Sequence, residues 1–190
     1  MKPHQHTLLF FIALLSFSTH ASLPYEAFPT APSIMAPDFQ LPSLGEHSIK
    51  LSDYKGKIVI LNFWATFCVP CRMEMPSLQA LADQYQDKDI EIIAVSLDEG
   101  REQAIKKWIT KVGLKFPIAL EGETAGDDYE VSSLPVTFII GKKGQLIGRI
   151  LGERDWNNDT THQFLDSLLD TLLDSEFDKV SHSPNDKSSG

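Results

Sequence analysis

The run KIVILNFW, from Lys57 to Trp64, ends four residues before a cysteine pair with two residues between its members. Its β-branched and aromatic side chains, with few polar residues among them, predict a central strand that is buried on both faces. A strand of this kind needs a packed layer on each side of its sheet. Cys68 and Cys71 therefore follow the end of a core strand, where the chain turns into the next element.

Strand and helix patterns alternate along the rest of the chain. The predicted strands cover residues 39–41, 48–51, 57–64, 90–97, 116–120, 136–140 and 145–150, and the predicted helices cover residues 73–86, 101–112 and 158–173. The acidic stretch 121–130 is interpreted as a solvated loop with a helical turn. This order predicts an α/β fold, in which a mixed central sheet is flanked by helices and preceded by an N-terminal β-hairpin.

The two ends of the chain differ in composition from this middle part. Residues 1–21 combine Lys2, an apolar run and small residues up to Ala21, which is typical of a secretory signal peptide cleaved after Ala21. The apolar run is shorter than the roughly 20 residues of a membrane span, although an uncleaved anchor stays open. We expect a linker at 22–35, one globular domain at 36–174 and a disordered tail at 175–190.

Charge and length exclude some classes of function. The chain of 190 residues carries a formal net charge of −9. An acidic protein releases no counterions from a phosphate backbone, so we expect no nucleic-acid partner. A hydrophobic fraction of 42% is typical of a globular domain with a real core.

The cysteine pair admits several interpretations. Zinc needs four ligands, and the two cysteines supply half of them, with none of the six histidines near them in sequence, so we expect no metal. A structural disulfide across so short a loop removes little entropy from the unfolded chain. A lone nucleophile would leave the second cysteine without a purpose, and two inert buried thiols complete the alternatives. Reversible thiol-disulfide exchange explains both the number and the spacing.

The predicted chemistry assigns different roles to the two sulfurs. Cys68, at the start of a helix, has a thiolate stabilised by free N–H groups and by the helix dipole, and is the expected nucleophile. Cys71, one turn further on, can attack the mixed disulfide and release the partner. Pro70 between them removes a backbone donor and stiffens the turn.

Several motifs resemble the TlpA/ResA type of thioredoxin-like proteins: APDFQL at residues 36–41, LSDYKGKIVILNFWATFCVPC at 51–71 and LPVTFIIGKKGQLIGRILG at 134–152. The resemblance implies a thioredoxin-like fold, no cofactor, and work outside the cytoplasm, in the periplasm or cell envelope. It also implies protein thiol or disulfide substrates and a membrane electron donor. We expect a monomer.

The same resemblance assigns roles to neighbours of the cysteines. Leu134-Pro135 matches a cis-proline loop that pairs with substrate backbone. Glu74 matches a glutamate near the active site, where a partly desolvated carboxylate with a raised pKa can carry the proton of the Cys71 thiol. A solvated helix charge is the alternative.

Three aromatic and amide side chains complete the predicted site. Asn62 stands where cytoplasmic thioredoxins carry an aspartate, and an amide cannot exchange a proton at neutral pH. Trp64 is predicted to be a wall of the active site that also packs the core. Phe67 is predicted to be an exposed contact for substrates.

The direction of electron flow stays open at this stage. The family pattern favours a disulfide reductase, with cytochrome c maturation as one setting. A disulfide-forming oxidase and a non-catalytic binding or chaperone module are the alternatives. A peroxidase of the related peroxiredoxin type shares the APDF opening but lacks the context of its lone cysteine.

Overall fold

The apolar run of the sequence forms the middle of the main sheet. β4 (Ile58–Trp64) is buried at all of its positions. Successive side chains of a strand point to opposite faces, so Ile58 and Ile60 join one core layer while Val59 and Leu61 join the other. The structure is a computed structural model that describes residues 26–27, 34–45, 47–120 and 123–181.

Strands from distant parts of the chain flank β4. Their bounds are β1 (Glu26–Ala27), β5 (Ile90–Ser96), β6 (Ile118–Ala119), β7 (Val136–Ile140) and β8 (Leu146–Leu151). The sheet has six strands in the order β1-β8-β7-β4-β5-β6. β4, β5 and β6 are parallel, whereas β7, β8 and β1 pair antiparallel with their neighbours. The predicted mixed central sheet is confirmed.

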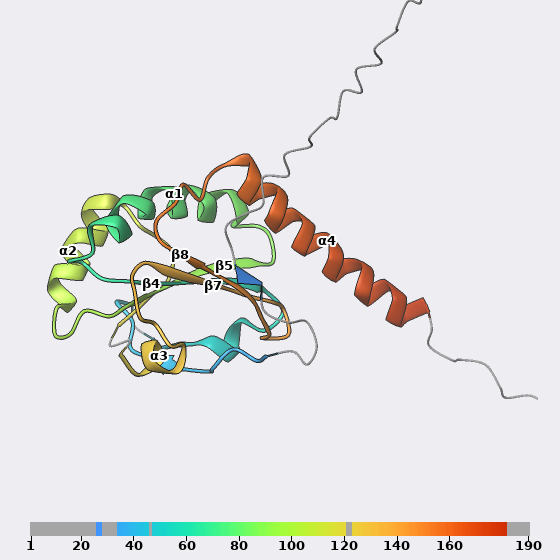
Figure 1. Cartoon of the computed structure of the whole chain (residues 1–190), viewed down its shortest axis with the longest axis horizontal. Helices are drawn as coiled ribbons and strands as arrows, with labels where there is room; N and C mark the ends of the chain where they lie inside the picture. The colour runs from blue at the N-terminus through green and yellow to red at the C-terminus, as the bar shows by residue number, and fades with distance from the viewer. Residues whose placement is uncertain (1–25, 28–33, 46, 121–122, 182–190) are drawn as a thin grey trace, which may run out of the picture.

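Helices and a small hairpin cover the two faces of the sheet (Figure 1). α1 (Val69–Tyr85) and α2 (Glu102–Val112) lie on one face, and α3 (Glu123–Asp128) lies on the other. β2 (Gln40–Leu41) and β3 (Ile49–Lys50) form a separate two-stranded sheet, followed by the 3₁₀ helix η1 (Leu51–Tyr54). Phe39 and Ile49 pack in the same core layer as Ala125 of α3. The N-terminal hairpin and the short helix α3 therefore cover that face together.

The first helix begins earlier than the sequence indicated. We predicted a helix from residue 73, but α1 begins at Val69 and continues past Pro76 to Tyr85. Pro70 lies in the first turn, where its missing N–H would have had no partner within the helix. The helix therefore starts directly after Cys68.

Two elements of the structure reach outside the predicted domain 36–174. Glu26–Ala27, within the predicted linker 22–35, forms β1 and pairs with Arg149 and Gly148 of β8. α4 (Asp159–Ser181) continues beyond Asp174, where we expected the domain to end. The sequence offers no helix breaker there, since no glycine or proline follows Asp174 before Pro184. The predicted signal segment and residues 182–190 of the predicted tail lie outside the described residues.

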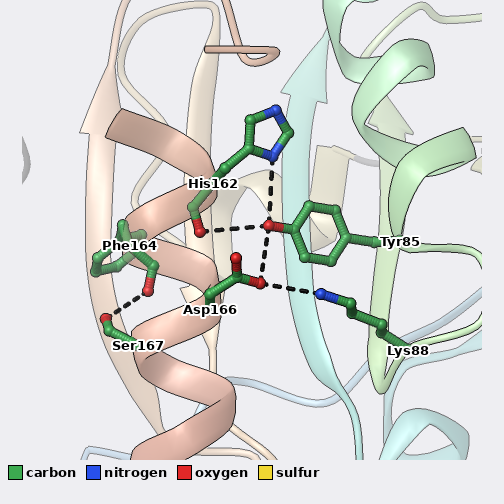
Figure 2. A network of polar contacts seen from close by, with 6 residues as sticks. All are labelled: Tyr85, Lys88, His162, Phe164, Asp166 and Ser167. Atoms are coloured by element: carbon green, nitrogen blue, oxygen red, sulfur yellow. Dashed lines mark hydrogen bonds and ion pairs between the residues drawn. The ribbon is translucent and has the colours of Figure 1, made fainter. Parts of the chain in front are cut away.

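α4 is fixed to the end of α1 by a polar cluster (Figure 2). Tyr85 Oη donates to Asp166 Oδ1 (3.2 Å) and to the carbonyl oxygen of His162 (3.3 Å). Lys88 Nζ forms an ion pair with the same Asp166 oxygen at 3.1 Å. Burial, followed by the charge of Asp166, raises the pKa of Tyr85 to about 12, so the hydroxyl keeps its proton at neutral pH.

In Figure 1, the later part of α4 runs away from the sheet. Across the part of the chain that the structure describes, no helix combines the length and the apolar character that a bilayer crossing requires.

Candidate active site

The two cysteines lie at the start of α1, shortly after β4 ends. They are joined by a disulfide with an S–S distance of 2.05 Å. Cys68 is the N-cap residue of α1, and its Sγ accepts a hydrogen bond from the backbone N–H of Cys71 at 3.2 Å. Cys68 is 9% exposed, whereas Cys71 is fully buried. The more accessible sulfur is therefore the one that the helix terminus stabilises as a thiolate.

Exposed apolar side chains surround this disulfide. Phe67, Val69 and Met73 are 66%, 53% and 65% exposed, and Pro70 is exposed between them. Phe67 is as exposed as predicted. The sequence analysis did not single out Val69 and Met73, because the apolar periodicity was followed only from residue 73. With the earlier start, their spacing of four residues puts them on one face of α1.

A cis proline lies at the same end of the sheet. The Leu134-Pro135 peptide bond is cis, as predicted. The next residue, Val136, pairs with Phe63 near the end of β4. Pro135 is buried and its carbonyl oxygen accepts a hydrogen bond from the Gly152 N–H at 2.9 Å, while Leu134 is half-buried.

Glu74 lies one turn after Cys71 and is buried, with 2% of its surface exposed. Its Oε1 accepts a hydrogen bond from Asn62 Nδ2 at 2.8 Å. Its Oε2 accepts from Trp156 Nε1 at 3.0 Å and from the Arg154 backbone N–H at 3.3 Å. Glu74 is thus a buried acceptor and not a solvated helix charge.

Burial raises the pKa of the Glu74 carboxyl above its ordinary value. The hydrogen bonds from Trp156, Asn62 and the Arg154 backbone act in the opposite direction, as does the positive charge of Arg154. A buried carboxyl group with a raised pKa is a stronger base than an exposed one, which suits a group that takes a proton from a thiol. The environment that the sequence analysis expected for Glu74 is therefore present.

Trp64 is a buried residue at the end of β4. Its side chain is fully buried and packs against Trp108 with the ring centroids 5.1 Å apart. The side chain lies in the same core layer as Cys68 and Cys71, so core packing is confirmed, and the role as a wall of the active site stays a prediction. This packing stabilises the end of the strand that precedes the cysteines.

Sequence reasoning missed a carboxylate that holds the active-site loop. Asp98 is buried, with 3% of its surface exposed. Its Oδ2 accepts from the Thr66 backbone N–H (2.7 Å) and from Ser96 Oγ (2.9 Å), and its Oδ1 accepts from Thr66 Oγ1 (2.6 Å). Thr66 precedes Cys68 by two residues, so this carboxylate fixes the loop that leads from β4 to the nucleophile. The position of Asp98 just after the predicted strand 90–97 was the available signal.

The site combines a thioredoxin-like sheet, a Cys-Val-Pro-Cys disulfide at the start of α1 and a cis proline just before the neighbouring strand β7. These features define the class of thiol-disulfide oxidoreductases. The chain belongs to the AhpC/TSA family, whose model matches residues 33–149, and within it to the ResA-type thiol-disulfide oxidoreductases. Its substrates are therefore protein thiols and disulfides.

Curated relatives and solved structures agree with this class. Thiol-disulfide oxidoreductase ResA of Bacillus thuringiensis (strain Al Hakam) is 42% identical over 120 residues, which cover 63% of this chain and 69% of the relative. The Geobacillus kaustophilus (strain HTA426) protein of the same name is 37% identical over 146 residues, which cover 76% and 83%.

Among solved structures, a protein assigned as the thiol:disulfide interchange protein DsbE of Chlorobium tepidum has a TM-score of 0.66 at 30% identity, covering 72% of this chain and 96% of that one. The thioredoxin domain of a Bacteroides vulgatus thiol-disulfide oxidoreductase has a TM-score of 0.63 at 25% identity, with the same coverage.

Proposed function

We propose that this oxidoreductase works as a disulfide reductase of the cell envelope. Reduced Cys68 attacks a substrate disulfide as a thiolate, which forms a mixed disulfide and releases the first substrate thiolate. Cys71 then transfers its proton to the Glu74 carboxylate and attacks Cys68 Sγ. The second substrate thiolate leaves, the substrate has gained two electrons, and the protein is left with the Cys68–Cys71 disulfide.

The unequal exposure of the two sulfurs is the observation that carries this order of events. A substrate sulfur can reach Cys68, which is 9% exposed, but has no access to the fully buried Cys71. Resolution by Cys71 therefore has to occur within the protein, next to the buried Glu74. The exposed patch of Phe67, Val69 and Met73 supports a protein substrate, because apolar surface around a reactive group favours contact with a polypeptide.

The direction of transfer rests on the sequence pattern, namely Asn62 and Glu74 in place of a buried aspartate, together with the N-terminal hairpin. In this proposal a membrane electron donor returns two electrons to the disulfide after each turnover. The disulfide form of an apocytochrome c cysteine pair is the substrate class that the family resemblance implies, and its dithiol is the product. Because the signal-like residues 1–21 direct export in this proposal, N-terminal sequencing of the mature protein should find Ser22 first. We also propose that the protein is a monomer.

Trapping tests the proposed order and names the substrates. Cys71→Ser leaves the mixed disulfide unresolved, so partners should remain attached through Cys68 and be released by reductant. Cys68→Ser is the matched control and should capture none. Equal capture by both variants would contradict the assigned roles, and capture by neither would favour a binding module.

The reduction potential tests the direction. Thioredoxin-like reductants have reduction potentials of about −270 mV, and strong oxidases have reduction potentials of about −120 mV. A reductase should have a potential on the reducing side of this range and should be found largely reduced in cells when the cysteines are rapidly alkylated. A strongly oxidising potential, with the pair oxidised in cells, would establish the oxidase alternative.

A further inference from the structure

The segment that follows β8 is tied to α1 beside the active site. Ser77 Oγ accepts a hydrogen bond from the Trp156 backbone N–H at 3.0 Å and donates to the carbonyl oxygen of Glu74 at 2.8 Å. The guanidinium of Arg154 lies over the Trp156 ring, 5.4 Å from its centroid. Trp156 itself is 2% exposed. Its backbone and its ring are thus both fixed, independently of what the indole N–H binds.

That N–H is directed at the carboxylate one turn after the resolving cysteine. A buried indole N–H usually finds an acceptor, and here the acceptor is Glu74 Oε2 at 3.0 Å. Trp64, in the same core layer, has an Nε1 with no hydrogen-bond partner among the described residues. Of these two buried tryptophans, Trp156 therefore contacts the proposed proton carrier Glu74 through its indole N–H, and Trp64 does not.

We propose that Trp156 is a positioning residue that holds Glu74 in its ionised form beside Cys71, so that the indole N–H sets the pH at which the resolving thiol can lose its proton. The inference rests on the proposed role of Glu74. An N–H donor bonded to a carboxylate stabilises the charged form more than the neutral one. Without it, the buried carboxyl would keep its proton at higher pH and could not accept one from Cys71.

Other charged groups near Glu74 define the electrostatic background. Arg154, Glu153 and Asp155 line the same groove as Glu74, between α1 and the segment after β8. On the sheet side, the neutral Asn62 donates to Glu74 and also to Thr137 Oγ1 at 2.9 Å. Trp156→Phe keeps an aromatic ring beneath the Arg154 guanidinium and leaves Asn62 in the sequence, while it removes the indole N–H.

The first experiment uses the unmodified protein. The indole ¹H–¹⁵N resonance of Trp156 should titrate with the same midpoint as the ¹³C carboxyl resonance of Glu74. It should stay constant with pH in Glu74→Gln, and the Trp64 resonance should not follow that midpoint. If the indole resonance of Trp156 does not change with pH through the Glu74 titration, the proposal is overturned, and this measurement needs only the wild-type protein.

The second experiment uses Trp156→Phe, with Trp108→Phe as the control because Trp108 packs on Trp64 and not on Glu74. Loss of one hydrogen bond to a charged group should raise the midpoint of the Glu74 titration by about one pH unit. The acid limb of the resolving step, measured by release of a mixed disulfide from Cys68, should move by the same amount. Trp108→Phe should move neither.

The outcomes separate this inference from the proposed function. An unchanged Glu74 midpoint in Trp156→Phe refutes the positioning role. A raised midpoint with an unchanged rate profile supports the positioning role and shows that Glu74 does not carry the proton of Cys71.

Discussion

Replacing Asp98 by asparagine should lower the free energy of unfolding. Asp98 lies 30 residues after the nucleophile Cys68 in sequence. The carboxylate is buried and accepts three hydrogen bonds, two from Thr66 and one from Ser96. Asparagine has nearly the same volume, but it lacks the charge and offers one acceptor oxygen in place of two. The substitution therefore tests the polar contacts and leaves the packing almost unchanged.

The magnitude follows from those three bonds. A hydrogen bond to a charged group contributes about 1.5–3 kcal/mol net, and a neutral one about 0.5–1.5 kcal/mol. In Asp98→Asn the amide oxygen can keep the two donors at Oδ2, while the Thr66 hydroxyl has to turn and accept from the amide. Each bond is weakened by about 1 kcal/mol, and relief from burying a charge offsets part of the sum. We expect the free energy of unfolding to fall by about 2 kcal/mol.

Urea unfolding of the oxidised protein at pH 7 measures this change. Thr66→Val removes one donor, and the double variant with Asp98→Asn should show a coupling energy of about 1 kcal/mol. Asp89→Asn is the control, since Asp89 forms an ion pair with Lys142 at 2.8 Å but is 62% exposed, so its loss should cost less than about 1 kcal/mol. A change below about 0.5 kcal/mol in Asp98→Asn, or strict additivity in the double variant, would refute the reasoning.

Three further predictions concern other parts of the domain. Because burial raises the pKa of Glu74 in the folded protein, the folded chain binds more protons between the ordinary value of 4.5 and the raised value. The free energy of unfolding should therefore fall as the pH rises through that window in the wild type, and urea curves at several pH values should show the fall missing in Glu74→Gln. Phe67→Ser should slow reduction of protein disulfides several-fold, with unchanged stability and unchanged rates on a small disulfide; an equal loss on both substrates would contradict a docking role. Gly113 ends α2 with a φ of +81°, and Gly113→Ala should lower the free energy of unfolding by about 1 kcal/mol, which thermal denaturation can check.

Local patterns were enough to predict the parts of the fold that depend on neighbours in sequence. β4 and the β7–β8 hairpin follow from apolar runs and a glycine turn, and α2 follows from its helical periodicity. Cys68 and Cys71 were identifiable because their chemistry depends on a spacing of three positions. These features are fixed within a few residues of chain, where a single sequence carries most of the information.

The rest of the site depends on contacts across the chain. Trp156 bonds to Glu74 from 82 positions away, and Asp98 bonds to Thr66 from 32 positions away. The burial of Trp64 depends on Trp108, which a helix brings over the sheet. Periodicity cannot indicate which polar side chain meets which, so the contacts of Asp98 and of Trp156 were missed.

The short strand β1 has a consequence for how the protein can be shortened or processed. Glu26–Ala27 occupies the outer side of β8, and the hydrogen bond from Ala36 N to Gly144 O secures the chain nearby. A fragment that starts at Ala36 would open this side of the sheet, and an open strand edge recruits other chains. Cleavage after Ala21 would instead retain four residues ahead of β1, so removal of a leader at that point would keep β1 on the outer side of β8.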